Sequence, residues 1–203
     1  MFITFEGIEG SGKSTQARRL VDELGSAALL TREPGGTALG QAIRRLLLDE
    51  GDVAAEAEVL LFLADRAQHV AEVVRPALRA GRIVLSERYV DSTYAYQGHG
   101  RGLRLDLLRA ATELATGGLL PDLTLFFDVP VQLGLARVAQ RGVRDRLEGE
   151  TREFHERTRL GYERLMSDDP DRWLRIDASR SSDEVWEEMR AALAARGVLN
   201  ALR

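Results

Sequence analysis

The chain has 203 residues, of which 44% are hydrophobic and 30% are charged, and its formal net charge is −4. This length suits one domain, and the composition is that of a globular protein rather than of a disordered chain. The absence of cysteine excludes disulfides, a cysteine-ligated zinc site and a cysteine nucleophile, and the acidic balance argues against binding duplex DNA or an anionic membrane through bulk charge.

Short apolar runs alternate along the chain with longer segments whose apolar residues recur at helical spacing. The runs that predict strands are 2–5, 27–30, 83–85, 123–127 and 173–176. The segments that predict helices are 13–24, 39–48, 54–79, 105–116, 131–140 and 151–167, followed by a last helix that begins with a capping box at Ser181 and Glu184. This alternation predicts an α/β fold with a five-stranded, mostly parallel sheet that is flanked by helices on both faces.

Ligands of such sheets bind beyond the carboxyl ends of the strands, so the loops after these strands are the places to search for a site. The loops after Phe5, Leu30, Leu85 and Phe127 are all polar, charged or rich in glycine. No apolar run reaches the roughly 18–20 residues needed to span a bilayer, and the first six residues lack the basic segment of a secretory signal. We therefore expect a cytoplasmic protein whose residues 1–203 form a single domain, without a membrane or nucleic-acid partner.

Residues 7–15, Gly-Ile-Glu-Gly-Ser-Gly-Lys-Ser-Thr, match the phosphate-loop pattern G-x-x-x-x-G-K-[ST]. The match lies between a predicted strand and a predicted helix, which argues against a chance glycine-rich turn. In this motif backbone N–H groups surround phosphate oxygens, the lysine reaches the β- and γ-phosphates, and the hydroxyl after it ligates Mg²⁺. Lys13 is the only lysine among 28 basic residues. The residues predicted to bind ATP are Gly7, Gly10, Ser11, Gly12, Lys13, Ser14 and Thr15.

A phosphate loop occurs in switches, motors and transferases, and the sequence separates these classes. A GTPase reads guanine with an Asn-Lys-x-Asp segment, which is impossible here because no lysine follows Lys13. A nucleic-acid motor needs basic grooves and usually a longer chain. Two classes stay open at this point: a small phosphoryl-transfer enzyme, and a nucleotide-binding regulator without turnover.

Five further segments resemble those of the thymidylate kinase family, and the resemblance extends over nearly the whole chain. The segments are residues 32–37 (REPGGT), 61–66 (LFLADR), 87–89 (ERY), 92–98 (STYAYQG) and 121–124 (PDLT). The resemblance implies a P-loop NTPase fold of the nucleoside monophosphate kinase type, and phosphorylation of dTMP to dTDP by ATP and Mg²⁺ for dTTP synthesis. It also implies a homodimer, which we expect through the helices at 54–79 and 105–116. Another nucleotide or nucleoside kinase of this fold, acting on dUMP or on a deoxynucleoside, is the nearest alternative.

The resemblance assigns roles in binding the phosphate and sugar of dTMP. A carboxylate at the position of Glu9 hydrogen-bonds the 3′-hydroxyl near the metal, although a solvated glutamate outside the cradle is the alternative. Arg88 holds the acceptor phosphate, and Arg32 is a further candidate for contacting it, in a loop that a cis Glu33–Pro34 peptide would tighten. Tyr96 packs under the sugar and disfavours a 2′-hydroxyl.

The base is assigned to a second group of residues. Phe62 and Arg66 are four residues apart on one predicted helix face, and in the family they stack on thymine and hydrogen-bond its carbonyl edge. Taken alone, Phe62 would more often be core and Arg66 a surface charge. Thr93 reads the base edge and favours thymine, and Gln97 is a nearby polar contact.

The metal and the transferred group are assigned last. Ser14 and Glu87 are the metal candidates; the family usually has Asp at position 87, so the longer Glu87 would act directly or through water, with a structural salt bridge as the alternative. Four arginines, Arg137, Arg141, Arg144 and Arg146, crowd a ten-residue span, which is most often a solvated helix end.

Thymidylate kinases carry a catalytic arginine either in the phosphate loop or in a lid. Gly10 occupies the phosphate-loop position here, so the resemblance implies the bacterial arrangement, with a lid at about 137–150 that is mobile without nucleotide. Arg146 is the first catalytic candidate and Arg141 the second. The complete set of predicted catalytic residues is Lys13, Arg88, Arg146, Arg141 and Glu9.

Overall fold

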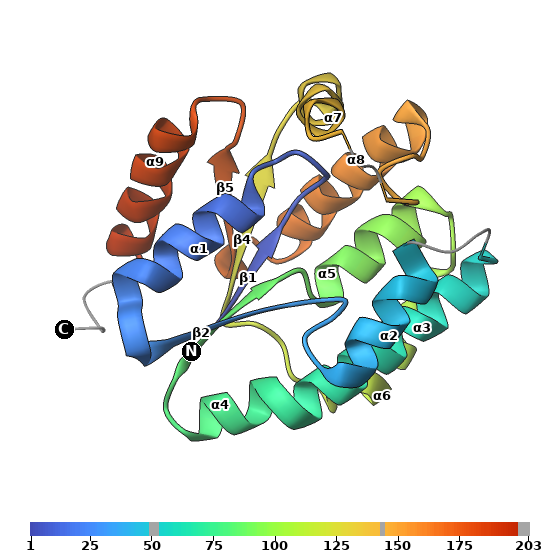
Figure 1. Ribbon diagram of the computed structural model, residues 1–203, viewed down its shortest axis with the longest axis horizontal. Helices are drawn as coiled ribbons and strands as arrows, with labels where there is room; N and C mark the ends of the chain where they lie inside the picture. The colour runs from blue at the N-terminus through green and yellow to red at the C-terminus, as the bar shows by residue number, and fades with distance from the viewer. Residues whose placement is uncertain (49–52, 143–144, 199–203) are drawn as a thin grey trace.

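The computed structural model describes residues 1–48, 53–142 and 145–198. Its centre is a five-stranded sheet in the order β2-β3-β1-β4-β5, with all four neighbouring pairs parallel (Figure 1). The strands are β1 (Phe2–Glu6), β2 (Ala28–Arg32), β3 (Ile83–Glu87), β4 (Leu123–Asp128) and β5 (Trp173–Asp177). The predicted α/β fold with a five-stranded parallel sheet is confirmed.

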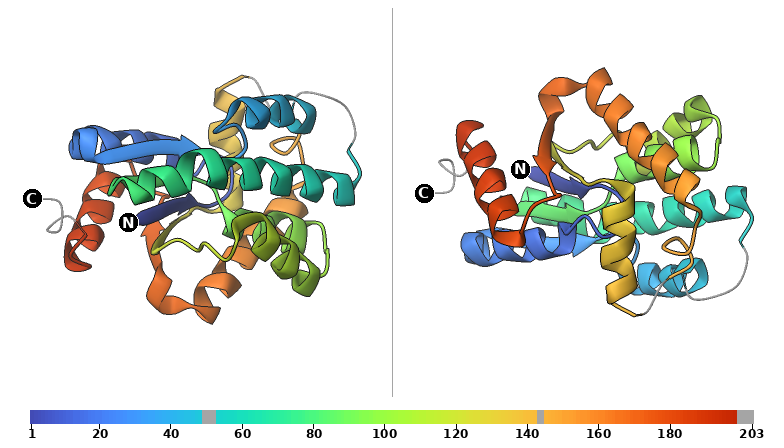
Figure 2. Two further views of the ribbon diagram at one scale, coloured as in Figure 1. Left: turned by 90° about the horizontal axis from the view of Figure 1, so that it is seen from below. Right: turned by 90° about the horizontal axis from the view of Figure 1, so that it is seen from above.

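Helices cover both faces of the sheet (Figures 1 and 2). The helices are α1 (Lys13–Leu24), α2 (Ala38–Leu48), α3 (Ala55–His69), α4 (Arg75–Arg79), α5 (Val90–Thr93), α6 (Leu105–Thr116), α7 (Val131–Gln140), α8 (Arg152–Asp168) and α9 (Ser182–Ala195). The segment predicted as one helix over 54–79 consists of α3, a π-helical stretch at Val70–Val74, and α4. The predicted capping box is present, since Ser181 and Glu184 exchange side-chain to backbone hydrogen bonds at the start of α9.

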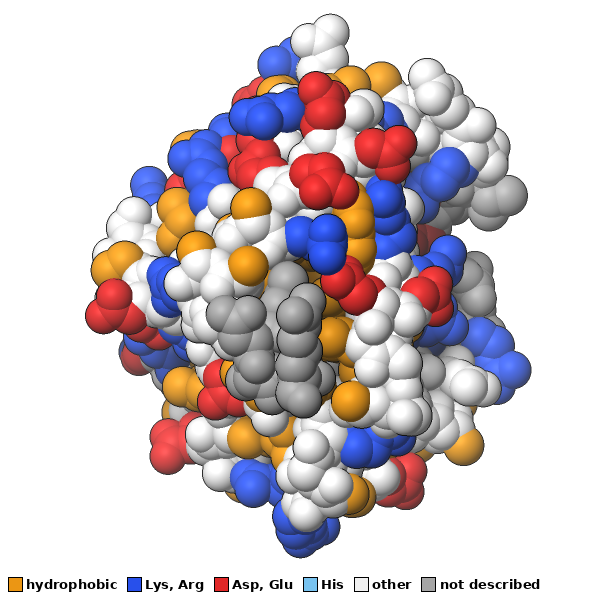
Figure 3. Space-filling view, turned by 90° about the vertical axis from the view of Figure 1, so that its left-hand side faces the viewer, with side chains coloured by type: hydrophobic (Ala, Val, Ile, Leu, Met, Phe, Trp, Pro, Cys, Tyr) orange, Lys and Arg blue, Asp and Glu red, His pale blue; other side chains and the backbone are white. Residues whose placement is uncertain are grey.

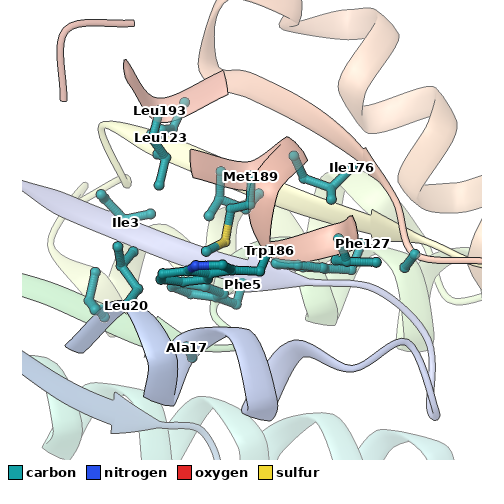
Figure 4. Packing of buried hydrophobic residues seen from close by; sticks show 14 of the residues in the cluster. Ile3, Phe5, Ala17, Leu20, Leu123, Phe127, Ile176, Trp186, Met189 and Leu193 are labelled. Atoms are coloured by element: carbon teal, nitrogen blue, oxygen red, sulfur yellow. The ribbon is translucent and has the colours of Figure 1, made fainter. Parts of the chain in front are cut away.

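The main core lies between the sheet and the pair α1 and α9 (Figure 4). Side chains of a strand alternate between its two faces, so Ile3 and Phe5 of β1 point into this core, whereas Phe2 packs on the opposite face with α4. Phe5 stacks on Phe127 of β4 with 5.7 Å between ring centroids, and Trp186 of α9 joins the same cluster. This packing fixes β1 in the centre of the sheet, where it carries the phosphate loop.

The register of the strands brings the loops after β1 and β3 to the same edge of the sheet. Phe5 of β1 lies opposite Glu87 of β3, and Glu6 lies opposite Phe126 of β4. The chain therefore leaves β1 into the phosphate loop at the same level at which it leaves β3 into Arg88. Neighbouring carboxyl ends of parallel strands form the crevice that binds ligands in such folds.

Residues 90–100 are helical, although the apolar pattern predicted no element there: α5 continues into a π-helical segment at Tyr94–Gly100. Two glycines of this segment allow neighbouring side chains to pack directly against its backbone. A Cβ atom on Gly98 would lie 2.4 Å from a methyl of Leu105, and one on Gly100 would lie 2.7 Å from the ring of Phe154. The segment packs extensively against α8, and it carries Tyr96 and Gln97.

On the side of the molecule where α1 and α9 lie, acidic and basic side chains are interspersed (Figure 3). Two ion pairs join these helices: Arg19 with Asp183 and Arg190 with Glu23, each at 2.8 Å. Within the described ranges, no helix combines the length and the apolar character that crossing a bilayer requires.

Candidate active site

Two adjoining pockets lie at the carboxyl edge of the sheet. The polar pocket, of about 1100 Å³, is lined by Glu9, Gly10, Gly12, Lys13, Ser14, Thr15, Arg32, Glu33, Arg44, Glu87, Arg88, Arg137, Arg141, Asp145 and Glu148. The aromatic pocket, of about 550 Å³, is lined by Glu9, Glu33, Pro34, Arg44, Leu48, Phe62, Arg66, Arg88, Ser92, Thr93, Tyr96, Gln97, Asp145 and Leu147. The pockets adjoin along the five residues that belong to both linings: Glu9, Glu33, Arg44, Arg88 and Asp145. Among these, Glu9 and Arg88 form an ion pair.

The phosphate loop folds around the side chain of Lys13. Its Nζ donates to the carbonyl oxygens of Gly7 at 2.9 Å and Ile8 at 2.8 Å, and to Oγ of Ser11 at 3.2 Å. Burial and the nearby Arg88 lower the pKa of Lys13 to about 7. A phosphate bound beside this ammonium would favour its charged form and raise the pKa again. Gly7 and Ser11 thus contact Lys13, and the other predicted loop residues line the polar pocket at the N-terminus of α1: Gly10, Gly12, Lys13, Ser14 and Thr15.

Gly10 has a left-handed backbone, with φ 71°, and it packs against α7. A Cβ atom at this position would lie 2.1 Å from the carbonyl oxygen of Gly134, so a side chain requires α7 to shift. Gly134 is equally tight, because its own Cβ would lie 2.6 Å from the carbonyl oxygen of Glu9. This close approach leaves no room for an arginine at position 10.

Glu9 is buried at the boundary of the two pockets, so the alternative of a solvated glutamate is wrong. Its Oε1 accepts from Oη of Tyr96 at 2.6 Å and from Nη2 of Arg88 at 2.7 Å, and Oε2 lies 3.2 Å from Nδ1 of the buried His155, outside hydrogen-bond alignment. Burial by itself would raise the pKa of Glu9, but the charges of Arg88 and Lys13 and the hydrogen bond from Tyr96 oppose it, and the pKa is lowered to about 2. Glu9 is therefore an ionised carboxylate at neutral pH.

Arg88 follows β3 and is the one non-glycine residue with positive φ, 68°, in the described part of the chain. Its guanidinium lies 4.7 Å from the ring centroid of Tyr96 and donates to Oη of Tyr96 at 2.9 Å. A further donor, Nη1, faces Oγ of Ser92 at 3.2 Å. The Arg88 side chain is about one-fifth exposed and lines both pockets, so a ligand in either pocket can reach it.

The aromatic pocket brings together the residues predicted to hold the base. Phe62 is half-buried and lines the pocket wall. Arg66, on the same face of α3, is only 2% exposed, so it is not a surface charge. It donates to Glu33 at 2.8 Å, to Oγ1 of Thr93 at 2.7 Å and to the Tyr89 carbonyl at 2.8 Å. Because Thr93 accepts from Arg66, its hydroxyl proton is left for another acceptor.

The remaining members of the predicted acceptor set divide between the two pockets. Gln97 lines the aromatic pocket and donates to Oε1 of the buried Glu58 at 2.8 Å. Arg32 is exposed and lines the polar pocket. The Glu33–Pro34 peptide beside it is cis.

Ser14 and Glu87, the predicted metal ligands, lie side by side at the edge of the phosphate cradle. Oγ of Ser14 donates to Oε2 of Glu87. A hydroxyl and a carboxylate are the hard oxygen donors that suit Mg²⁺, which commonly uses one or two protein ligands and completes its shell with phosphate and water. The described residues contain no cluster of three His, Cys, Asp or Glu side chains able to hold a metal ion.

The arginine cluster is divided by the structure. Arg137 and Arg141 line the polar pocket, where Arg141 pairs with Glu148 at 2.6 Å. Arg146 lines neither pocket; it donates to the carbonyl oxygen of Leu47 at 2.8 Å and pairs with Glu58. The structure thus does not bring Arg146 to the phosphate loop. Arg144 lies outside the described residues.

Comparison with known proteins identifies the family. The family model described as "Thymidylate kinase" matches residues 5–189. A curated thymidylate kinase of Desulfovibrio desulfuricans is 52% identical over 96% of this chain and 95% of its own length, and one of Synechococcus sp. is 53% identical over 91% and 90%. The crystal structure of thymidylate kinase from Ehrlichia chaffeensis has a TM-score of 0.78 and 33% identity, covering 95% of this chain and 98% of that one.

The chain belongs to the thymidylate kinase family. The P-loop kinase fold that the sequence predicted is confirmed by the likeness to the thymidylate kinase from Ehrlichia chaffeensis. Both pockets and the phosphate loop lie within the stretch that the family model matches.

Sequence reasoning missed several residues of this site. Glu33, Arg44 and Asp145 line both pockets, and Arg137 lines the polar one, yet none of them was a predicted site residue. Arg44 is one of two adjacent arginines on α2, and spacing does not tell which of the two faces the site. A signal did exist for Glu33, because it lies in the REPGGT segment that carried the resemblance.

Proposed function

We propose that this protein transfers the γ-phosphoryl group of ATP to dTMP and releases ADP and dTDP. The observation that carries the proposal is the junction of the two pockets at Glu9 and Arg88. A triphosphate on the phosphate loop and a monophosphate whose base fills the aromatic pocket would meet there head to head. An oxygen of the dTMP phosphate attacks the γ-phosphorus, and the bond from that phosphorus to the β–γ bridging oxygen breaks.

The phosphate loop is the donor side of this arrangement. Backbone N–H groups of the loop and Nζ of Lys13 would hold the β- and γ-phosphates, and the N-terminus of α1 adds its positive end. Ser14 and Glu87 would hold Mg²⁺, which neutralises charge on the phosphate oxygens. Since a phosphate oxygen is already a nucleophile, positioning and electrostatic stabilisation supply most of the catalysis.

The aromatic pocket is the acceptor side. Its half-buried Phe62 offers a ring face for a pyrimidine, and Arg66 and Thr93 offer donors for a carbonyl edge. Tyr96 packs between Phe154 and Tyr162, with its hydroxyl on Glu9, and would lie under the sugar. Glu9 would accept from the 3′-hydroxyl, and Arg88 and Arg32 would hold the monophosphate.

The lid arginine is assigned by position among the described residues. Arg141 lines the same polar pocket as Lys13 and pairs with Glu148, whereas Arg146 is anchored on α2 and α3. We therefore propose Arg141 as the arginine that stabilises the transferred phosphoryl group. Arg146, the first candidate from the sequence, would instead anchor residues 145–150 to α2 and α3. Lid mobility over about 137–150 stays a prediction.

A homodimer through α3 and α6 is part of the proposal. These helices pack against each other, and three leucines on them, Leu60, Leu107 and Leu114, are exposed by 59–87%. Sedimentation velocity of the wild type and of Leu114→Glu tests it: a dimer that the substitution dissociates supports the proposal, and a wild-type monomer contradicts it. The cytoplasmic location stays a prediction.

The activity is tested by coupling ADP formation to NADH oxidation in the presence of ATP and Mg²⁺. The assay is run without acceptor and with dTMP, dUMP, TMP or thymidine, with Lys13→Met as the inactive control. The proposal predicts ADP formation that requires an acceptor and is fastest with dTMP. Faster turnover of another acceptor would assign the fold to a different kinase activity, and ATP binding without acceptor-dependent ADP would assign it to a regulator.

A further inference from the structure

Glu6, the last residue of β1, is a buried carboxylate that lines neither pocket. Its three hydrogen bonds all go to the surroundings of Arg88. Oε1 accepts from the backbone N–H of Tyr89 at 2.7 Å, and Oε2 accepts from Oγ of Ser92 at 2.6 Å and from Oη of Tyr162 at 2.8 Å. A fully buried carboxylate is costly to keep unless its partners are well arranged, so this arrangement calls for a role.

The backbone of Arg88 needs external support. An L-residue at φ 68° persists only where the surrounding structure holds it. The N–H of Arg88 donates to the carbonyl oxygen of Phe5 at 3.0 Å, and its carbonyl oxygen accepts from Oγ of Ser86 at 2.8 Å. The bond from Tyr89 to Glu6 fixes the next peptide. Through Tyr89, the residue after Arg88, Glu6 thus completes the set of contacts that fasten this turn to β1.

The same carboxylate also organises the groups behind the guanidinium. Nη1 of Arg88 lies 3.2 Å from Oγ of Ser92 and 3.5 Å from Oη of Tyr162, the two hydroxyls that donate to Glu6. Burial and the nearby Asp91 raise the pKa of Glu6 to about 7, so the carboxylate is ionised above neutral pH. In that form it only accepts, and both hydroxyls can direct their protons to Glu6 and their lone pairs to Arg88. The other amino group of the guanidinium, Nη2, is held by Glu9 and Tyr96.

We propose that Glu6 is a positioning residue that holds Arg88 in the orientation required for the acceptor phosphate. This inference rests on the proposed role of Arg88 as the phosphate-holding group. It assigns Glu6 no contact with either substrate.

The isosteric variant Glu6→Gln changes this arrangement in a defined way. The N–H of Tyr89 requires an acceptor, so the amide oxygen of Gln takes that place and the NH₂ group points toward Ser92 and Tyr162. Those hydroxyls then accept from the amide, and neither has the carboxylate oxygen that took its proton. The orientation that presents their lone pairs to Arg88 is no longer fixed, although the size of the side chain is conserved, and we expect the guanidinium to lose its fixed position.

A control for the burial of a carboxylate is Asp91, which is also fully buried and lies three residues after Arg88 in the chain. Its oxygens accept from Arg172 at 2.7 and 3.0 Å and from Oγ1 of Thr124 at 3.2 Å, and none of these groups hydrogen-bonds Arg88. Asp91→Asn therefore perturbs a buried ion pair of the same region without removing a hydrogen-bond partner of Arg88. Because it also removes a charge that raises the pKa of Glu6, the comparison is made at about pH 8.5, where Glu6 is ionised in both proteins.

The experiment compares the affinities for dTMP and for thymidine by calorimetry in the wild type, Glu6→Gln, Asp91→Asn and Arg88→Gln. Thymidine lacks the phosphate, so the ratio of the two affinities isolates phosphate recognition. We expect Glu6→Gln to weaken dTMP binding about 10- to 100-fold and thymidine binding less than twofold, and Asp91→Asn to leave the ratio unchanged. If Glu6→Gln does not fold, Tyr162→Phe removes one connecting hydroxyl and is expected to lower the ratio in the same direction.

Two results would overturn the inference, and they differ in meaning. If Arg88→Gln lowers the ratio while Glu6→Gln weakens both ligands equally or neither, Glu6 is structural only and the role of Arg88 stands. If Arg88→Gln itself leaves the ratio unchanged, the proposed role of Arg88 is wrong, and the inference built on it is wrong as well.

Discussion

Nη2 of Arg88 lies 2.7 Å from Oε1 of Glu9, and this ion pair lies on the boundary between the polar and the aromatic pockets. The two side chains come from different loops, after β3 and β1, which the parallel register places at one level. A carboxylate that faces a sugar hydroxyl and a guanidinium that faces a phosphate would act on the same nucleotide from this position.

Acid should weaken the fold through Glu9. The pKa of Glu9 is about 2 in the folded protein and near 4.5 in the unfolded chain, so the unfolded state binds the proton more readily. This contribution to stability is present above about pH 4.5 and is lost as the pH falls toward 2. Glu9→Gln lacks it, so the difference in unfolding free energy between wild type and variant should shrink from pH 5 to pH 3, as measured by urea denaturation. A difference independent of pH would contradict this.

Removing the hydroxyl of Tyr96 should weaken catalysis without relaxing the preference for deoxyribose. Tyr96→Phe deletes the donor to Glu9 and the acceptor for Arg88 but leaves the ring in place. Losing such charge-linked hydrogen bonds costs about 1.5–3 kcal/mol, or about 10- to 100-fold in kcat/KM for dTMP. The ratio of kcat/KM for dTMP and TMP should stay near the wild-type value. Tyr94→Phe is the matched control, because Tyr94 lines neither pocket.

Substitutions of Arg141 and Arg146 should have different kinetic effects. Arg141→Ala is expected to lower kcat by about 10²- to 10³-fold with little change in the KM for dTMP, because it removes charge beside the transferred group. Arg146→Ala removes a partner of the buried Glu58, whose remaining partners are Arg101 and Gln97. Gln97 lines the aromatic pocket. It should raise the KM for dTMP and lower stability. If Arg146→Ala depressed kcat more than Arg141→Ala, the order of the two would revert to the one predicted from sequence.

The contact between the phosphate loop and α7 should tolerate no added methyl group. Gly134→Ala places a Cβ 2.6 Å from the carbonyl oxygen of Glu9, so the loop or the helix must shift. Overpacking of this kind costs about 1–3 kcal/mol, and a displaced cradle should weaken ATP binding. Gly149→Ala, whose Cβ would have an ordinary 3.4 Å contact, is the control. Equal ATP affinities for the two variants in a fluorescent-nucleotide titration would refute the prediction.

Elements with a regular apolar period could be predicted from the sequence, in places to the residue: α1, α6 and α7 have the predicted bounds. The helical stretch over 90–100 could not. Its glycines and its π-helical turns interrupt the 3.6-residue period, and their reason is tertiary, since Gly98 and Gly100 admit Leu105 and Phe154. Local propensity contains no information on which elements approach so closely.

The candidate site divides in the same way. The motifs placed the phosphate-loop residues around Lys13, and they placed Phe62, Arg66 and Tyr96 in the aromatic pocket, as the structure has them. Motif spacing could do so because it fixes the position of a residue along a single element. Arg146 does not lie where expected, because its direction depends on the path that brings residues 145–150 onto α2 and α3. Arg44 and Glu33 reach the pockets through folding of distant segments, which spacing does not encode.

The most direct test of the account is a crystal structure with dTMP and a non-hydrolysable ATP analogue bound together. We predict the triphosphate in the loop around Lys13, the thymine against Phe62 in the aromatic pocket, and the monophosphate on Arg88, pointing toward the γ-phosphate. A pyrimidine bound away from Phe62, or a monophosphate without contact to Arg88, would contradict the account.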